Sequence, residues 1–324
     1  MIRFGNYPLT VGKRFGIIVG NLMETKAMKT KQPKVKMQKY TLQDFEKQFP
    51  NDDVCLEWLK NYLYPNGIFC ETCQKITNHY RVASRKSFSC QFCGNHVHPT
   101  ADTIYHKSTT PLRLWFYAVY LMASTRCGIS AKQLERELGV TYKTAWRMFK
   151  QIRSMLAEDD TQLSGKVEAD ETYVGGKMKG GKRGRGSENK TIVAGVVERR
   201  GAVIARVVPN VKAKTLIPFI QEKVEPNTMI FTDEFKSYNQ LSNKGYGHER
   251  VFHAQDIYVI GEAHTNGLEG FWSLVKNGIR GVYHSVSSKY LQDYFNEYAF
   301  RYNRRFDTNP MFLSFLSQVK KSCD

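Results

Sequence analysis

Three acidic residues in the second half of the chain stand where they could share one metal site. Asp170 lies in the segment KVEADETYV, at a predicted strand end, and Asp233 lies in MIFTDEFKSY, at the end of another predicted strand. Glu269 lies in HTNGLEGFWSLVKNG, which has helical periodicity, and Lys276 follows two helical turns later on the same face. Carboxylates without paired histidine or cysteine select hard divalent ions such as Mg²⁺ or Mn²⁺. A pair of such ions would activate a water or a 3′-hydroxyl and stabilise the leaving oxygen of a phosphoryl transfer.

The neighbouring acids and aromatic residues have simpler explanations. Glu168, Glu171 and Glu234 flank the two aspartates and are expected to face solvent or to form ion pairs. Phe271 and Trp272 lie on the predicted helix and are expected to belong to the hydrophobic core, with base stacking as the alternative. The order and spacing of the three acids, rather than any one of them, therefore carries the metal-site prediction.

The segments around these acids alternate in the way that a mixed α/β sheet requires. Three runs rich in β-branched residues predict consecutive strands, KVEADETYV, KTIVAGVVER and AVIARVVPN. A helix is predicted at about Lys212–Val224, then a strand at TMIFTDE, a short helix at SYNQLSNKG and a fifth strand at HERVFHA. Two further helices follow, one at Asn266–Gly278 and one in SSKYLQDYFNEYAFRYNRRF. This order is that of a ribonuclease-H-like sheet, in which the first and fourth strands are neighbours, so Asp170 and Asp233 are expected to face one another.

Two cysteine pairs predict a structural metal site in the first half of the chain. Cys70 and Cys73 are separated by two residues, as are Cys90 and Cys93, and 16 residues lie between the pairs. This spacing is typical of a zinc ribbon, in which two knuckles joined by a hairpin hold one tetrahedral Zn²⁺. A redox site would need only one such pair, usually at a helix N-terminus, and is the less favoured alternative. The nearby histidines are expected at the surface rather than among the ligands: His79, His96 and His98.

The segment after the cysteine pairs has the pattern of a helix-turn-helix module. A strongly apolar helix is predicted in TTPLRLWFYAVYLMASTRCG, with Thr110 as its N-cap and Pro111 as its first residue. In ISAKQLERELGVTYKTAWRMFKQIRSMLAE, Gly139 allows a sharp turn between two helices and Thr141 caps the second. The outer face of that second helix is predicted to meet DNA through these residues: Tyr142, Lys143, Arg147, Lys150 and Arg153. The alternative is a three-helix packing module with no role in DNA binding.

The charge of the chain favours a polyanionic partner. Its 324 residues include 48 Lys and Arg against 30 Asp and Glu, which gives a formal net charge of +18. A glycine-rich basic segment, GGKMKGGKRGRGSENK, lies between the first two predicted strands. It is predicted to follow a DNA backbone through Lys182, Arg183 and Arg185, and the alternative is a flexible hairpin loop without a partner.

The hydropathy and the cysteine spacing indicate the cellular compartment of the protein. No apolar run approaches the roughly 20 residues that cross a bilayer. Four of the seven cysteines form the two close pairs, which favours a reducing compartment over a secreted disulfide framework. The prediction is therefore a cytoplasmic, nucleoid-associated protein without a membrane partner.

As a set, these motifs resemble bacterial insertion-sequence DDE transposases of the zinc-ribbon, ISXO-type group. The resemblance is carried by the cysteine pairs, the helix-turn-helix segment, EADETYVGGK, TDEFKSY, HTNGLEGFWSLVKNGIRGVYHSVS and FNEYAFRYNRR. It implies a divalent-metal polynucleotidyl transferase that cuts and joins DNA, with Asp170, Asp233 and Glu269 as metal ligands and Lys276 against the DNA. Some relatives have asparagine in the third ligand place, which would be Asn266 here; we favour Glu269 because an anion holds Mg²⁺ better than a neutral amide. The resemblance also implies at least a homodimer when active, since two element ends must be brought together.

The expected domain order follows from these motifs. Residues 1–39 form a basic, disordered extension, 40–65 a short helical segment, 66–100 the zinc ribbon, 108–158 the helix-turn-helix module, 165–310 the ribonuclease-H-like catalytic domain and 311–324 a C-terminal tail. Two other functions stay open at this point. One is a non-catalytic DNA-binding regulator derived from a transposase, which would show a damaged acidic trio. The other is a structure-selective ribonuclease-H-like nuclease, which would cleave branched DNA without joining ends.

Overall fold

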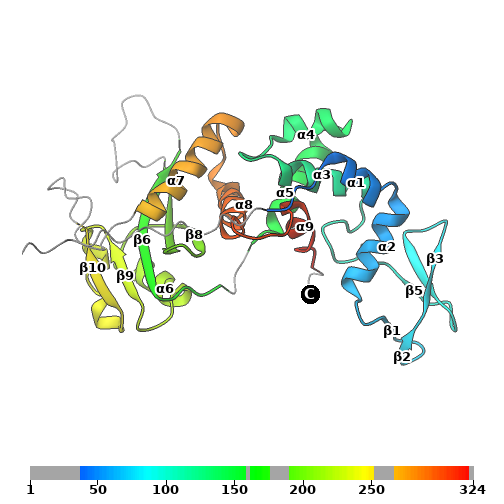
Figure 1. The fold of residues 1–324 in the computed structure, drawn as a ribbon, viewed down its shortest axis with the longest axis horizontal. Coiled ribbons are helices and arrows are strands. Elements are labelled where there is room, and N and C mark those ends of the chain that lie inside the picture. Colours follow the sequence, from blue (N-terminus) through cyan, green and yellow to red (C-terminus); the bar gives the residue numbers. More distant parts are fainter. Residues whose placement is uncertain (1–36, 158–160, 176–189, 252–265, 321–324) are drawn as a thin grey trace, which may run out of the picture. The chain divides into compact units, whose positions relative to one another are not determined.

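The computed structural model describes residues 37–157, 161–175, 190–251 and 266–320 of the chain (Figure 1). Residues 37–157 hold helices and a small β-ribbon, and the described residues from 161 onward hold a mixed sheet with its helices. The predicted basic extension at 1–39 lies almost wholly outside the described residues. None of the helices in these ranges is long and apolar enough to cross a membrane.

Residues 37–157 contain five α-helices and five short strands. The helices are α1 (Leu42–Gln48), α2 (Asp52–Leu63), α3 (Leu112–Ser124), α4 (Ala131–Leu138) and α5 (Tyr142–Ser154). The ribbon strands are β1 (Ile68–Cys70), β2 (Lys75–Thr77), β3 (His79–Val82), β4 (Ser87–Cys90) and β5 (His96–Val97). β1 pairs with β2, and β3, β4 and β5 form a second antiparallel sheet, so each cysteine pair sits in its own knuckle.

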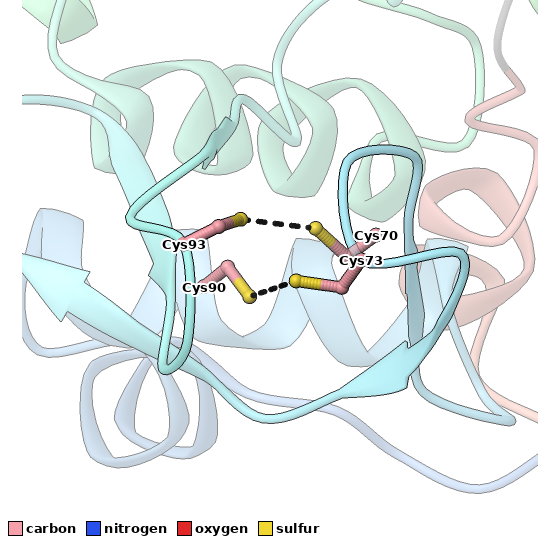
Figure 2. Close-up of side chains that lie close together, drawn as sticks. All are labelled: Cys70, Cys73, Cys90 and Cys93. Atoms are coloured by element: carbon pink, nitrogen blue, oxygen red, sulfur yellow. Dashed lines mark hydrogen bonds between the residues drawn. The ribbon is translucent and has the colours of Figure 1, made fainter.

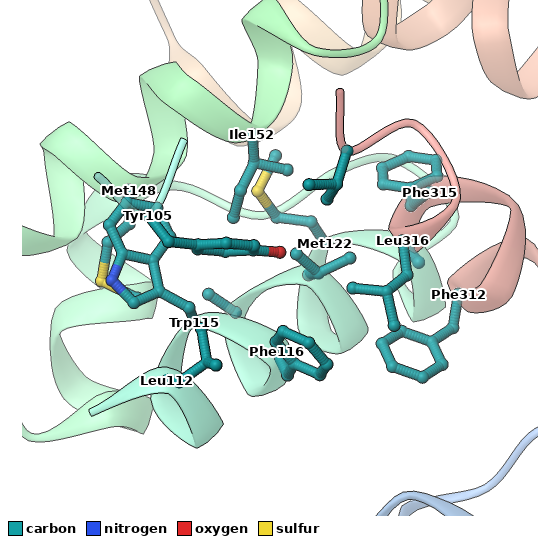
Figure 3. Close-up of a cluster of buried hydrophobic side chains, with 14 of the residues drawn as sticks. Tyr105, Leu112, Trp115, Phe116, Met122, Met148, Ile152, Phe312, Phe315 and Leu316 are labelled. Carbon is teal, nitrogen blue, oxygen red and sulfur yellow. The ribbon is translucent and has the colours of Figure 1, made fainter. Parts of the chain in front are cut away.

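An aromatic-rich core joins these helices to the end of the chain (Figure 3). The apolar helix α3 runs through this core, and its Trp115 and Phe116 have no exposed surface. The segment from residue 311, expected to be a tail, forms α9 (Met311–Leu316), which packs against α3 and places Phe312 and Phe315 in the same core. Full burial of one such side chain contributes about 1.5–3 kcal/mol, so α9 helps to stabilise the packing of α1 and α3.

The start of α3 differs from the prediction. Pro111, and not Thr110, occupies the cap position, and it has no side-chain donor or acceptor. The Asp52 carboxylate from α2 takes this role, because its two oxygens accept hydrogen bonds from the Leu112 and Arg113 amides at 3.0 and 2.9 Å. A negative charge is favourable at a helix N-terminus, so the cap comes from another helix rather than from the adjacent threonine.

The second part of the fold is built on a five-stranded sheet with the order β10-β9-β6-β7-β8. The strands are β6 (Lys166–Val174), β7 (Thr191–Glu198), β8 (Val203–Val208), β9 (Met229–Thr232) and β10 (Gly247–Arg250). β6, β7 and β8 form an antiparallel meander, whereas β9 is parallel to β6 and β10 is parallel to β9. This is the predicted ribonuclease-H-like order, with the first and fourth strands, β6 and β9, as neighbours.

Helices cover both faces of this sheet. They are α6 (Ala213–Lys223), α7 (Asn266–Gly278) and α8 (Leu291–Asn303). α6 packs on the face that carries Val167 and Ala169 of β6, and α7 and α8 pack on the other face. Because side chains alternate along a strand, Glu168 and Asp170 point toward α7, whereas Glu171 points to the α6 side.

The outer edge of the sheet at β8 is covered by amide side chains of α8. The Gln292 side chain accepts a hydrogen bond from the Val207 amide at 2.7 Å and donates one to the Ala205 carbonyl at 2.9 Å. The Asn303 side chain makes the same pair of bonds with Val203, at 2.8 and 3.1 Å. Two side-chain amides thus bind backbone groups that a further strand would otherwise pair.

Candidate metal centres and nucleic-acid surface

The four predicted zinc ligands meet between the two knuckles of the ribbon (Figure 2). The Sγ atoms of Cys70 and Cys93 are 3.5 Å apart, those of Cys73 and Cys90 are 3.9 Å apart, and all four lie within 4.8 Å of one another. A tetrahedral Zn²⁺ with Zn–S bonds of about 2.3 Å separates its sulfurs by about 3.8 Å, so the quartet fits this ion. Hydrogen bonds from the Cys93 amide and the Thr77 hydroxyl lower the pKa of Cys90, whereas the neighbouring thiols, first that of Cys93, raise the pKa of Cys73 to about 12.

Two of the three histidines near the quartet lie at the surface, as predicted. His96 and His98 are exposed, as expected. His79 is not at the surface: it is 9% exposed, and its Nδ1 lies 3.0 Å from the Thr77 carbonyl oxygen. The surface prediction is wrong for His79 because its position on β3 faces inward.

Asp170 and Asp233 lie at adjacent positions where β6 and β9 separate. β9 pairs with β6 as far as Thr232 opposite Ala169, and each aspartate is the next residue of its own segment. The expectation that Asp170 ends its strand is wrong, because Asp170 lies inside the nine-residue strand β6, which continues beside β7 to Val174. The two acids therefore mark the end of the parallel β6–β9 pairing rather than the end of β6.

The Asp170 carboxylate is partly buried and close to other acids. Its Oδ2 accepts a hydrogen bond from Trp272 Nε1 of α7 at 3.0 Å. Burial raises the pKa of Asp170 to about 7; the negative charges of Glu171 and Asp233 add to this shift, and the Trp272 hydrogen bond opposes it. A divalent cation would relieve both causes, since it replaces the proton and offsets the repulsion between the acids.

α7 carries the three other predicted site residues. Asn266 is its first residue and Glu269 follows one turn later, and both side chains are exposed. Burial lowers the pKa of Lys276, and the nearby charge of Asp170 opposes that shift. Within the described part of the chain, Asp170, Asp233 and Glu269 do not reach the mutual 4.8 Å spacing that the four cysteines have. The structure thus brings Asp170 within electrostatic reach of Asp233 and Lys276, but it does not close the trio.

The acids that flank the two aspartates only partly follow the prediction. Glu234 is exposed, as expected. Glu168 forms the expected ion pair, with Arg199, but it is buried rather than near solvent. Glu171 contradicts the prediction, because it is buried and its Oε2 accepts a hydrogen bond from the Tyr238 hydroxyl at 2.9 Å. Both are buried because α7 and the segment after β9 cover the two faces of β6.

The helix-turn-helix segment has the predicted local geometry. Gly139 adopts a left-handed φ of 61° between α4 and α5, and the Thr141 side chain caps α5. Four side chains of the predicted outer face are exposed: Tyr142, Lys143, Arg147 and Lys150. Arg153 is 1% exposed and pairs with Glu297 of α8 at 2.6 Å, so the prediction that it faces DNA is wrong.

The predicted basic arm falls mostly outside the described residues. Lys182, Arg183 and Arg185 belong to residues 176–189, which the structure does not describe. Lys190, the last residue of that basic segment, is described, and its charge helps to lower the pKa of Lys276. One end of the segment is therefore within electrostatic reach of α7.

Three residues near the acids were not among the predicted site residues. Trp272 is 5% exposed and belongs to the core, as expected, but its indole N–H also binds Asp170. Gly195 of β7 is directly opposite Asp170, and an added Cβ there would lie 2.5 Å from Cη2 of Trp272. Tyr238 binds Glu171 on the other face of the sheet. In the sequence, the glycine inside the β-branched run TIVAGVVE indicates a point where another group comes close to the strand backbone, which here is the Trp272 ring.

Two family models match the parts of the chain that hold the cysteine quartet and the acids. Residues 50–96, which include the cysteine quartet, match the transposase zinc-ribbon domain, and residues 162–303, which include the acids, match the ISXO2-like transposase domain. An uncharacterized transposase-like protein of Haemophilus influenzae is 32% identical over 97 residues, which are 30% of this chain and 77% of that protein. The chain belongs to the ISXO2-like transposase family. The resemblance inferred from the motifs is confirmed.

A second relative extends the similarity of this transposase-family chain over most of its length. An uncharacterized protein in the transposable element ISH50 of Halobacterium salinarum is 29% identical over 271 residues, which are 76% of this chain and 90% of that protein. Among solved structures, a chain of a pre-cleavage Mos1 transpososome covers 64% of this chain and 80% of its own length, at 11% identity and a TM-score of 0.25. The family is shown by the sequence matches.

Proposed function

We propose that the chain is the DNA transposase of an insertion sequence, which binds element ends and carries out metal-dependent strand cleavage and strand transfer. The observation that carries the proposal is the meeting of two acids at one point of the sheet. Asp170 and Asp233 follow the last paired residues of β6 and β9, and burial together with the neighbouring acids raises the pKa of Asp170 to about 7. A partly buried carboxylate that lies beside a second acid in this way suits a divalent cation.

In this proposal Asp170, Asp233 and Glu269 hold Mg²⁺ or Mn²⁺, with Asn266 as the alternative third ligand. When bound, a pair of such ions supplies Lewis-acid activation of a water or 3′-hydroxyl and stabilises the leaving oxygen. Lys276 is within electrostatic reach of Asp170, and its positive charge holds a DNA phosphate near the acids. The chain thus orients the scissile phosphate between an anionic and a cationic group.

The remaining parts bring DNA to these residues. α5 presents its exposed residues to the major groove: Tyr142, Lys143, Arg147 and Lys150. The basic arm follows the DNA backbone through Lys182, Arg183 and Arg185, and the net charge of +18 supports such a partner. One structural Zn²⁺ holds the ribbon through the cysteine quartet. We place the active form as at least a homodimer on two element ends, in the cytoplasm with the nucleoid.

Strand transfer of a labelled element end tests this function. The purified chain is incubated with Mg²⁺, an end fragment taken from the DNA that flanks its reading frame, and a plasmid target. We expect cleaved ends and joined products from the wild type, and neither from Asp233→Asn, which should still bind the end. Glu234→Gln is the matched control, because Glu234 is the exposed acid next to Asp233.

The other outcomes separate the alternatives. Cleavage of branched DNA without joining would indicate a nuclease, and end binding without cleavage by the wild type would indicate a regulator. Normal strand transfer by Asp233→Asn would show that the assignment of the acids is wrong.

A further inference from the structure

α7 is attached to β6 at two separate points. Oε2 of Glu168 accepts hydrogen bonds from the Gly267 and Leu268 amides at 2.8 and 3.1 Å, in the first turn of the helix. Oδ2 of Asp170, two residues further along the same face of β6, accepts a hydrogen bond from Trp272 Nε1 at 3.0 Å. Two carboxylates of one strand therefore bind one helix.

The spacing of the two contacts matches along the strand and along the helix. Two residues of a β-strand rise by about 6.7 Å. The four to five residues from the first contact to Trp272 rise by about 6–7.5 Å along an α-helix. Both contacts therefore form together at one register of α7 on β6. A shift of the helix by one residue, about 1.5 Å and 100° of rotation, would break both.

The Glu168 contact is a buried charge with a partner for each oxygen. The residue is 1% exposed, and Oε1 pairs with Arg199 Nε at 3.2 Å. The amides at a helix N-terminus carry partial positive charge, so an ionised carboxylate is stabilised there. An added Cβ at Gly267 would lie 2.8 Å from Oε2, so a larger residue there would displace this carboxylate oxygen.

The Trp272 contact depends on a matching space in β7. Gly195, opposite Asp170 in the β6–β7 register, leaves the room that the indole ring fills. The ring also packs against Phe271 and Phe295, with centroids 5.4 and 5.9 Å away. Packing therefore fixes the ring, and its N–H is directed at Asp170.

We propose that Glu168 and Trp272 are positioning residues that together set the register of α7 on β6. They thereby hold Glu269 and Lys276, which the same helix carries, at the level of Asp170. This inference rests on the proposed function for the roles of Glu269 and Lys276. It adds to the site two residues that act through the helix rather than on DNA.

Two single variants, their double variant and a control test the proposal. Trp272→Phe removes the indole N–H and keeps a ring, and Glu168→Gln removes the charge that binds the α7 amides. Trp115→Phe is the control, because Trp115 is also fully buried and its Nε1 donates to Ser108 Oγ at 2.9 Å. Three quantities are measured: the single-turnover rate of end cleavage, end affinity without divalent ions, and Mn²⁺ affinity by electron paramagnetic resonance.

We expect each single variant to lower the cleavage rate and the Mn²⁺ affinity by about 10–100-fold, as loss of a residue that orients a metal ligand does. End affinity should not change, and Trp115→Phe should match the wild type. Because both residues act on one register, the double variant should resemble the slower single variant rather than multiply the two effects.

The contrary results are equally specific. If both single variants cleave ends and bind Mn²⁺ as the wild type does, the two residues do not set the register. If the two effects multiply in the double variant, the residues do not act on one shared register. A wild type that binds Mn²⁺ without cleaving ends would overturn the proposed function, and the Mn²⁺ affinities of the variants would then decide this inference alone. A wild type that binds no Mn²⁺ would overturn both.

Discussion

Asp170 of β6 is paired directly with Gly195 of β7, and the Trp272 ring fills the space beside that glycine. This arrangement leaves no room for a side chain at Gly195, since an added Cβ would lie 2.5 Å from the indole. The hydrogen bond that directs Trp272 to Asp170 therefore depends on a residue of a third element.

We expect Gly195→Ala to displace the indole and to destabilise the fold by about 1–3 kcal/mol through overpacking. Chemical denaturation measures this cost, and end cleavage measures the effect on the site. Gly270→Ala is the matched control, because a Cβ at Gly270 on α7 meets nothing within 4 Å. Alanine there should be neutral or stabilise by up to about 1 kcal/mol. Equal stability of the two variants would show that the space at Gly195 is not required.

Glu297 of α8 joins two arginines in a buried ion pair. Burial raises the pKa of Glu297, but Arg153 and Arg301 outweigh this and lower it below the ordinary value. The pair therefore stabilises the fold above the usual glutamate range near pH 4, and this stabilisation is lost as the pH falls through the lowered pKa. Glu297→Gln leaves two guanidinium groups without a negative partner. It should lower the free energy of unfolding, measured by chemical denaturation at pH 7, by about 3–5 kcal/mol.

The control for that cost is an exposed pair with similar geometry. Arg206 and Glu222 are 2.6 Å apart, with side chains 36% and 50% exposed. Glu222→Gln should cost less than about 1 kcal/mol by the same denaturation measurement. If both variants lose the same stability, burial does not set the strength of the Glu297 pair.

The cysteine quartet predicts that the folded protein contains bound zinc. We expect the purified chain to carry one Zn²⁺ and Cys73→Ser to lose it, with a lower melting temperature, because structural zinc contributes to folding. Elemental analysis and thermal unfolding measure the two effects. Cys127→Ser is the control, since Cys127 is an exposed cysteine outside the quartet. Zinc retained by Cys73→Ser would rule out the four-thiolate site.

The Asp170 carboxyl predicts a pH-dependent response to metal. Its pKa of about 7 lies above the ordinary value, so the folded protein binds the proton more tightly than the unfolded chain does, and stability falls as the pH rises toward 7. A bound divalent ion replaces that proton. We therefore expect Mg²⁺ to raise the melting temperature more at pH 8 than at pH 6. Asp170→Asn should remove the difference, and an equal response of the wild type at both pH values would contradict the assignment.

The exposed cations of α5 predict a change in salt dependence. Lys143→Ala and Lys150→Ala should each weaken end binding and reduce the slope of log affinity against log salt by about 0.9, the value for one lost phosphate contact. Fluorescence anisotropy at several salt concentrations measures this slope. Lys214→Ala on α6 removes the same charge from another exposed position and should leave the slope unchanged. If the salt-dependence slope decreases equally in all three variants, the effect comes from net charge and not from contacts of α5 with DNA.

Sequence pattern predicted those features that depend on neighbouring residues. The β-branched runs located the strands, the helical periodicity located α7, and the cysteine spacing predicted the quartet, because each pattern is local. It failed for charged residues whose partners are distant. Glu168 binds amides 99 and 100 residues away, and Arg153 binds a glutamate 144 residues away. Nothing near these residues in the chain distinguishes them from surface charges, so only the tertiary structure shows that they are buried.

The amide side chains along β8 also limit how copies of this chain can associate. An unpaired strand edge accepts a strand from any molecule that comes close, and proteins crowded onto one DNA site come close often. Because Gln292 and Asn303 already bind the backbone there, a neighbouring copy cannot extend the sheet at β8 without first displacing them. If two copies meet on paired DNA ends, their sheets would therefore not join at β8.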